Sequence, residues 1–95
     1  MGIIDKLNKD FESRVRLGIM SVLMVNDWID FTEMNSLLNI TDGNLASHSS
    51  ALEKSGYIEV KKEFVGKKPK TSYRVTNIGR TAFVSHLNSL EKLIK

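Results

Sequence analysis

The chain has 95 residues, of which 41% are hydrophobic and 26% charged, with one proline and no cysteine. These values exclude a disulfide scaffold, a cysteine-based metal site and a thiol nucleophile, and they are typical of a folded domain rather than a disordered segment. The formal net charge is +3, and the excess lies between residues 61 and 74. A chain of this length supports one hydrophobic core, so we expect a single domain over residues 1–95.

No uninterrupted apolar run reaches the ~18 residues of a membrane span. Acidic and lysine side chains also interrupt the apolar residues of the N-terminus, which argues against a signal peptide. We therefore expect a cytoplasmic protein with no membrane partner.

The first predicted element is a short amphipathic helix within residues 1–12. Its apolar residues recur at steps of three or four: Ile3, Ile4, Leu7 and Phe11. Ser13 is a suitable N-cap for a second helix, which is apolar nearly all round from Val15 to Val25 and therefore belongs at the centre of the core. Neither Pro nor Gly separates the two helices, so they can be separate or continuous.

A short extended segment and two short helices follow. Residues 28–31 are predicted to be extended, and Thr32 is the expected N-cap of the next helix. Asn39 can end that helix because asparagine tolerates the left-handed conformation. The segment that begins at Thr41 then offers a cap for a further helix ending near Ser55. Two short helices joined by a tight turn have the spacing of a helix-turn-helix.

The pattern then changes to that of strands. Residues 57–65 and 71–76 are rich in β-branched and aromatic side chains, and the Gly-Lys-Lys-Pro-Lys segment at 66–70 has turn chemistry, so we predict a β-hairpin. A last helix occupies residues 77–95. Its apolar residues step by four, three and four: Phe83, Leu87, Leu90 and Ile94.

The predicted hairpin carries the positive charge. Six basic residues stand there against one acid, Glu63. Lysines also protect strand edges from aggregation, but that purpose needs fewer of them. On a projecting ribbon such side chains neutralise phosphates and release counterions. The predicted phosphate contacts are Lys61, Lys62, Lys67, Lys68, Lys70 and Arg74.

The order of elements, with a hairpin directly after the helix-turn-helix, resembles the small winged-helix regulators related to the MarR and ArsR families. The local sequence is also similar: residues 40–60 to the turn, recognition helix and first wing strand, residues 16–20 to the start of the central helix, and Thr71, Tyr73, Thr76 and Gly79 to the returning strand and closing helix. The resemblance implies an α+β, mainly α fold, namely a winged helix-turn-helix with one β-hairpin wing and flanking N- and C-terminal helices.

This sequence departs from the family pattern in places. Ser49 stands where a core leucine is usual, Ala46 where serine is common, and Arg14 where proline often opens the helix. The metal-sensing cysteines of the ArsR branch are absent. We therefore expect no metal site and no cofactor, and a small-molecule effector stays undetermined.

The resemblance places the recognition helix, about residues 42–55, in the major groove of DNA. With Leu45 and Leu52 inward, the 100° helical step sends small polar side chains to the opposite face, without Arg or Gln for a bidentate base contact. His48 lies on the flank, where it is as suited to a structural hydrogen bond as to a DNA contact. The predicted DNA-facing residues are Thr41, Gly43, Asn44, Ser47, His48, Ser50, Ala51 and Lys54.

Both chain ends carry apolar stripes beyond what a core over residues 14–76 needs. We therefore predict that residues 1–12 and 77–95 form a homodimer interface. Its predicted contacts are Ile3, Ile4, Leu7, Phe83, Leu87, Leu90 and Ile94.

The predicted function is specific or semi-specific binding of double-stranded DNA by a dimeric transcriptional regulator. No nucleophile motif, carboxylate pair or phosphate-binding glycine loop indicates an enzyme. The alternative is a winged-helix protein-protein interaction module that docks through the hairpin or the last helix.

Overall fold

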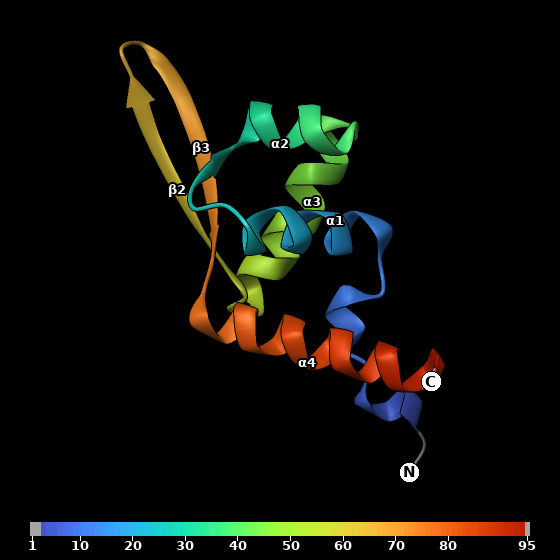
Figure 1. The fold of residues 1–95 in the computed structure, drawn as a ribbon. Helices are drawn as coiled ribbons and strands as arrows, with labels where there is room; N and C mark the ends of the chain where they lie inside the picture. Colours follow the sequence, from blue (N-terminus) through green and yellow to red (C-terminus); the bar gives the residue numbers. More distant parts are fainter. Residues whose placement is uncertain (1–2, 95) are drawn as a thin grey trace.

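The computed structural model describes residues 3–94 and shows the predicted winged helix-turn-helix (Figure 1). It is mainly helical, with one antiparallel sheet and helical segments at both ends. The elements in chain order are η1 (Ile3–Lys6), η2 (Lys9–Phe11), α1 (Arg14–Met24), β1 (Ile29–Asp30), α2 (Phe31–Leu38), α3 (Asp42–Lys54), β2 (Ile58–Val65), β3 (Lys68–Val75) and α4 (Asn77–Ile94).

Three boundaries follow the predicted capping chemistry. The Ser13 hydroxyl accepts a hydrogen bond from the Val15 amide at 3.1 Å and so begins α1. The Thr41 hydroxyl accepts one from the Asn44 amide, also at 3.1 Å, and begins α3. Asn39 ends α2 in the left-handed conformation, with φ 52°. Each signal acts within four residues, which is why the sequence alone reveals it.

The N-terminal segment is helical as predicted but is divided in two. Instead of one amphipathic helix the segment forms two short 3-10 helices, η1 and η2. The Asn8 side chain accepts from the Asp10 amide at 2.9 Å and caps η2, which interrupts any continuous helix. Because Ser13 is extended, η2 is also separate from α1.

Two further boundaries differ from the prediction. Asp30, not Thr32, is the N-cap of α2, since its carboxylate accepts from the Glu33 amide at 2.8 Å. Pairing of β1 with β3 keeps Ile29 and Asp30 extended, so the helix begins earlier than expected. The hairpin turn consists of Gly66 and Lys67 alone, and residues 68–70 belong to β3.

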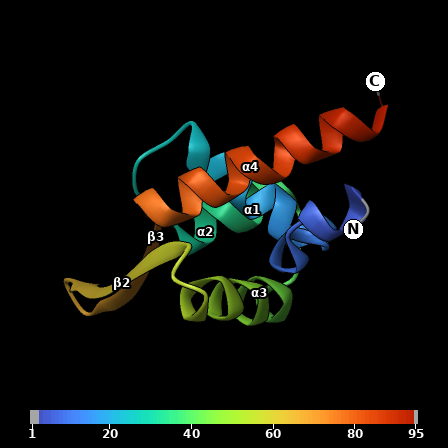
Figure 2. The same cartoon turned by 90° about the horizontal axis from the view of Figure 1, so that it is seen from below.

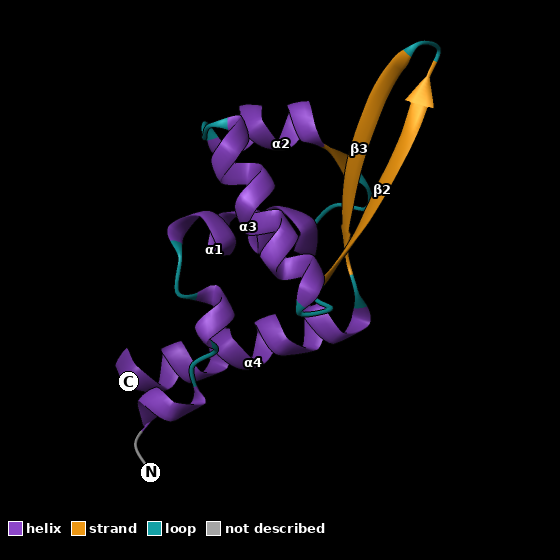
Figure 3. Ribbon diagram, turned by 180° about the vertical axis from the view of Figure 1, so that it is seen from behind, coloured by secondary structure: helices purple, strands orange, loops and turns teal. Residues whose placement is uncertain are grey.

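The three strands form an antiparallel sheet in the order β1-β3-β2. The register of β2 and β3 runs from Ile58 opposite Val75 to Val65 opposite Lys68, and the tight turn is made by Gly66 at φ 66°. The inner half of the hairpin packs on the core, whereas residues 61–70 are all exposed. Figures 1 and 3 show this outer half projecting beyond α2.

An aromatic cluster joins the N-terminal segment to the far end of the chain. The Phe11 ring is fully buried, and its centroid lies 5.2 Å from that of Tyr57 and 5.3 Å from those of Phe83 and His86. Phe83 is only 3% exposed. Phe83 was predicted to be a dimer contact, but its side chain is buried in the core of its own chain.

α4 passes close to the start of the hairpin at Gly79. The Tyr57 carbonyl accepts from the Thr76 amide at 3.0 Å, and a Cβ placed on Gly79 would overlap that same carbonyl. The Thr76 hydroxyl accepts from the Gly79 amide at 2.9 Å, which caps the helix. None of the helices within residues 3–94 combines the length and hydropathy that a membrane span requires.

Candidate nucleic-acid interface

The outer face of α3 is a strip of small polar side chains. Leu45, Ser49 and Leu52 are buried against the core, as the helical period predicts for the two leucines. The opposite side is open to solvent, and Figure 3 looks onto it. Of the predicted DNA-facing residues, Ala51 and His48 are half-buried, and the exposed ones are Thr41, Gly43, Asn44, Ser47, Ser50 and Lys54.

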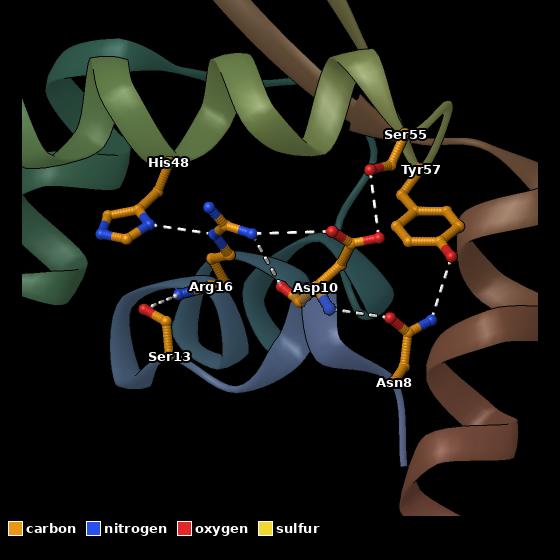
Figure 4. Close-up of polar contacts among 7 residues, drawn as sticks. All are labelled: Asn8, Asp10, Ser13, Arg16, His48, Ser55 and Tyr57. Atoms are coloured by element: carbon orange, nitrogen blue, oxygen red, sulfur yellow. Dashed lines mark hydrogen bonds and ion pairs between the residues drawn. The ribbon is translucent and has the colours of Figure 1, made fainter. Parts of the chain in front are cut away.

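His48 is held by an intramolecular hydrogen bond. Its Nδ1 accepts from the Arg16 Nε at 3.0 Å (Figure 4). The same guanidinium lies 3.7 Å from the Asp10 carboxylate, which fixes its position. Of the two interpretations of His48, the structural hydrogen bond is therefore the one observed.

Residues of the N-terminal segment also fix the C-terminal end of α3 and the start of the hairpin (Figure 4). Asn8 Nδ2 donates to the Tyr57 hydroxyl at 3.0 Å, and the Ser55 hydroxyl donates to Asp10 at 3.1 Å. The Asn8 amide donates to His86 Nδ1 at 3.0 Å and ties the same segment to α4. Sequence analysis missed this network because its partners are 45 to 78 residues apart.

The outer hairpin presents unpaired positive charge. Within residues 3–94 four of the predicted lysines form no ion pair: Lys62, Lys67, Lys68 and Lys70. Figure 2, seen from below, shows α3 and the hairpin on one side of the molecule and α4 on the other. The polar strip of α3 and the basic hairpin therefore form one continuous side.

Arg74 and Lys61 differ from these four lysines. The Arg74 guanidinium bonds Glu59 at 2.9 Å, lies 4.0 Å from the Asp27 carboxylate and covers the Trp28 ring, 4.5 Å from its centroid. Lys61 lies 4.3 Å from the same ring centroid. Both cations thus stabilise the base of the hairpin, where their charges are partly balanced within the chain.

A pocket of about 210 Å³ separates α3 from the hairpin where the family pattern has a leucine. Ser49 lines it, buried, with its hydroxyl donating to the Ala46 carbonyl at 3.3 Å. Burial raises the pKa of the Tyr73 hydroxyl on the opposite wall, and a hydrogen bond with Ser49 partly opposes this. Polar contacts thus replace the apolar packing of a leucine between helix and wing.

The predicted dimer residues lie where α4 extends beyond the core. η1 packs beside the C-terminal half of α4 (Figure 1). Ile4, Leu87 and Ile94 are exposed, the last by 85%, while Leu7 and Leu90 are half-buried. The side chain of Ile3, like residues 1, 2 and 95, lies outside the described part of the chain.

Comparison with known proteins agrees with this geometry. Residues 15–94 match the family model of the winged helix DNA-binding domain. The chain belongs to this family. It is 37% identical over 87 residues to an uncharacterized protein of Methanocaldococcus jannaschii, covering 92% of this chain and 95% of that protein.

Solved structures show the same fold for this winged helix protein. A transcriptional regulator homologue from Pyrococcus horikoshii superimposes with a TM-score of 0.88 at 30% identity, covering 99% of this chain and 95% of that one. MarR superimposes with a TM-score of 0.78 at 19% identity, covering 95% of this chain but 65% of MarR. At that identity the likeness concerns the fold, which both proteins share.

Proposed function

We propose that this winged helix protein is a transcriptional regulator that binds double-stranded DNA as a homodimer. The observation that carries the proposal is the pairing of an exposed polar strip on α3 with a hairpin on which four of the five lysines have no partner within the described chain. Family membership and the likeness to the Pyrococcus regulator homologue support it.

In this proposal α3 enters the major groove. Hydroxyl and amide groups there bond base edges or phosphates, but the strip holds no long side chain for a bidentate base contact. His48 supports the DNA-binding face indirectly, because its hydrogen bond with Arg16 holds α3 against α1. The proposed contacts are Thr41, Gly43, Asn44, Ser47, Ser50, Ala51 and Lys54.

The hairpin supplies most of the affinity. Lys62, Lys67, Lys68 and Lys70 contact phosphates, and Lys61 and Arg74 hold the base of the hairpin in place. Each neutralised phosphate releases counterions, so binding weakens steeply with salt.

The second copy packs on η1 and the end of α4. We infer that the contacts are Ile3, Ile4, Leu7, Leu87, Leu90 and Ile94, with Phe83 supporting them from the core. A two-fold axis there would present two recognition helices to half-sites about 34–36 Å apart. The chain would act in the cytoplasm, as a single domain and without catalytic activity.

A salt titration tests the proposal. Fluorescence anisotropy on duplex DNA between about 50 and 200 mM salt compares the wild type with a Lys67→Ala, Lys68→Ala, Lys70→Ala variant. If each wing neutralises two or three phosphates, the log–log salt slope becomes shallower by roughly 4 to 5 for the dimer. A Lys9→Ala, Arg14→Ala variant loses exposed positive charge away from both the hairpin and the proposed dimer surface, and it should keep the wild-type slope.

Either of two results contradicts the assignment. A wild-type protein that does not bind duplex DNA would be inconsistent with a regulator. An unchanged slope in the wing variant would mean that the hairpin does not contact phosphates, and the protein-interaction module would then be the better description.

A further inference from the structure

The tip of the hairpin carries two large apolar side chains that no described part of the chain covers. Phe64 is 75% exposed and its neighbour Val65 59%. Both lie in the outer half of β2, beyond the last contact with the core. Neither side chain stabilises the fold by burial. Contact with a binding partner would explain why an aromatic ring is exposed to water at this position.

The two side chains face opposite ways. Phe64 lies across from Pro69, and Val65 across from Lys68. Alternate residues of a strand share a face, so Phe64 is on the face of Val60, which lines the pocket beside α3. The Phe64–Pro69 pair thus continues the side of the hairpin that meets the recognition helix.

The reach of the hairpin is comparable with the spacing of the DNA grooves. At ~3.4 Å per residue, Phe64 lies roughly 14 Å further along β2 than Val60. With α3 in a major groove, the next minor groove is half a helical turn away, about 17 Å. The apolar pair therefore projects towards the minor groove that flanks the proposed site.

The charges around the pair identify the kind of partner. Four lysines without ion pairs within residues 3–94 lie near it: Lys62 on the same face, Lys67 in the turn, and Lys68 and Lys70 on the other face. The nearby acid, Glu63, is on the other face and lies 4.0 Å from Lys61. An apolar tip framed by cations fits a polyanion with flat apolar surfaces inside it, which describes stacked bases between phosphate backbones.

We propose that the Phe64–Pro69 pair is an apolar wedge that enters the minor groove and bends the DNA at a base step. The inference rests on the proposed DNA-binding function and adds a second means of recognition to it. Inserted Phe or Pro side chains partly unstack a step, at least cost where the step is flexible, as in TA or CA. Sequence preference then arises from deformability, which compensates for the short side chains of α3.

Bending and binding are measured together on a duplex labelled at both ends for energy transfer, with 2-aminopurine at a central TA step. We expect the wild type to bring the ends closer and to raise the 2-aminopurine fluorescence. Phe64→Ala should remove both signals and weaken binding about tenfold, the scale of one lost base–aromatic contact. The salt slope should stay unchanged, because the lysines remain.

Val65→Ala is the matched control, since it deletes an exposed apolar side chain one residue away on the opposite face. It should bend and bind DNA as the wild type does. Both variants should unfold thermally at the wild-type temperature, because neither side chain is buried.

The outcomes separate the two proposals. A wild type that binds no duplex contradicts the regulator itself. A wild type that binds without bending, a Phe64→Ala variant that bends DNA normally, or an equal loss in both variants overturns the wedge and leaves the regulator standing.

Discussion

Gly79 allows α4 to cross the backbone of Tyr57. Gly79→Ala would place a methyl group on the Tyr57 carbonyl, a rigid backbone atom, so helix and hairpin must move apart. We expect the free energy of unfolding to fall by roughly 3 kcal/mol, which exceeds the ~1 kcal/mol that alanine gains in helix propensity. Urea denaturation measures the change.

Gly43→Ala is the control for this prediction. A Cβ at Gly43 meets nothing within 4 Å, and the residue lies exposed in the first turn of α3. Its stability should equal or slightly exceed that of the wild type. Similar losses at both glycines would mean that backbone entropy, not the contact with Tyr57, sets the effect.

His86 gives the fold a dependence on pH. Burial lowers its pKa from the ordinary 6.5, and Glu12 only partly opposes the shift. The unfolded chain therefore takes up the proton first, so stability present above about pH 6.5 is lost as the pH falls below it. Protonation also removes the acceptor of the Asn8 amide.

Urea unfolding at about pH 7.5 and pH 5.5 tests this prediction. His86→Gln retains an acceptor without a proton to gain, so its stability should fall less between the two conditions. An identical fall in both proteins would assign the pH dependence to other groups.

Residue roles were predictable where they depend on near neighbours. Ser13, Asn39 and Thr41 behave as their cap chemistry indicates. The partners of His48 and His86 were not predictable, because Arg16 and Asn8 lie 32 and 78 residues away along the chain and meet the histidines only through tertiary packing.

Among the elements, α3 and the hairpin divide the proposed work. Replacing Ser47 and Ser50 of α3 by alanine should cost about 1–3 kcal/mol on the preferred duplex while leaving non-specific binding and its salt slope unchanged. Anisotropy on preferred and scrambled duplexes measures both. Ser21→Ala, which alters an exposed serine of α1, should change neither.

A uniform loss on both duplexes would contradict this division, because it would place the serines on phosphates rather than on bases.

Outside the N-terminal segment, periodicity predicted whether each element is a helix or a strand, but it did not predict which side chains are buried. The step of α4 correctly groups Phe83 with Leu87 and Ile94 on one side, yet only Phe83 is covered, because the helix extends beyond the core. The sequence analysis placed Arg74 among the phosphate contacts of the wing. Its ion pair with Glu59 across the sheet follows from the strand register, which composition does not reveal.

At the scale of the whole molecule, the extents of 52 × 25 × 21 Å reflect two projections, the hairpin and the end of α4. The second is the proposed dimer surface. Leu87→Glu with Ile94→Glu places charges on it without disturbing the core, since both side chains are exposed. Sedimentation at micromolar concentration should show about twice the mass of one chain for the wild type and a shift towards monomer for the variant.

Ile78→Glu serves as the control, because Ile78 is equally apolar and exposed but lies in the first turn of α4, away from η1. It should remain dimeric. A monomeric wild type across that range would contradict the proposed assembly.

The hydrogen bond between Asn8 and His86 closes a loop of 78 residues. Closing a long loop costs more chain entropy than closing a short one. We therefore expect contacts of this kind to form after nearer contacts have built a core whose burial offsets that cost. That closure, together with the packing of Phe11 on Phe83, places η1 beside α4. A chain that is still folding thus lacks the complete dimer surface of η1 and α4. Only fully folded chains would then dimerise.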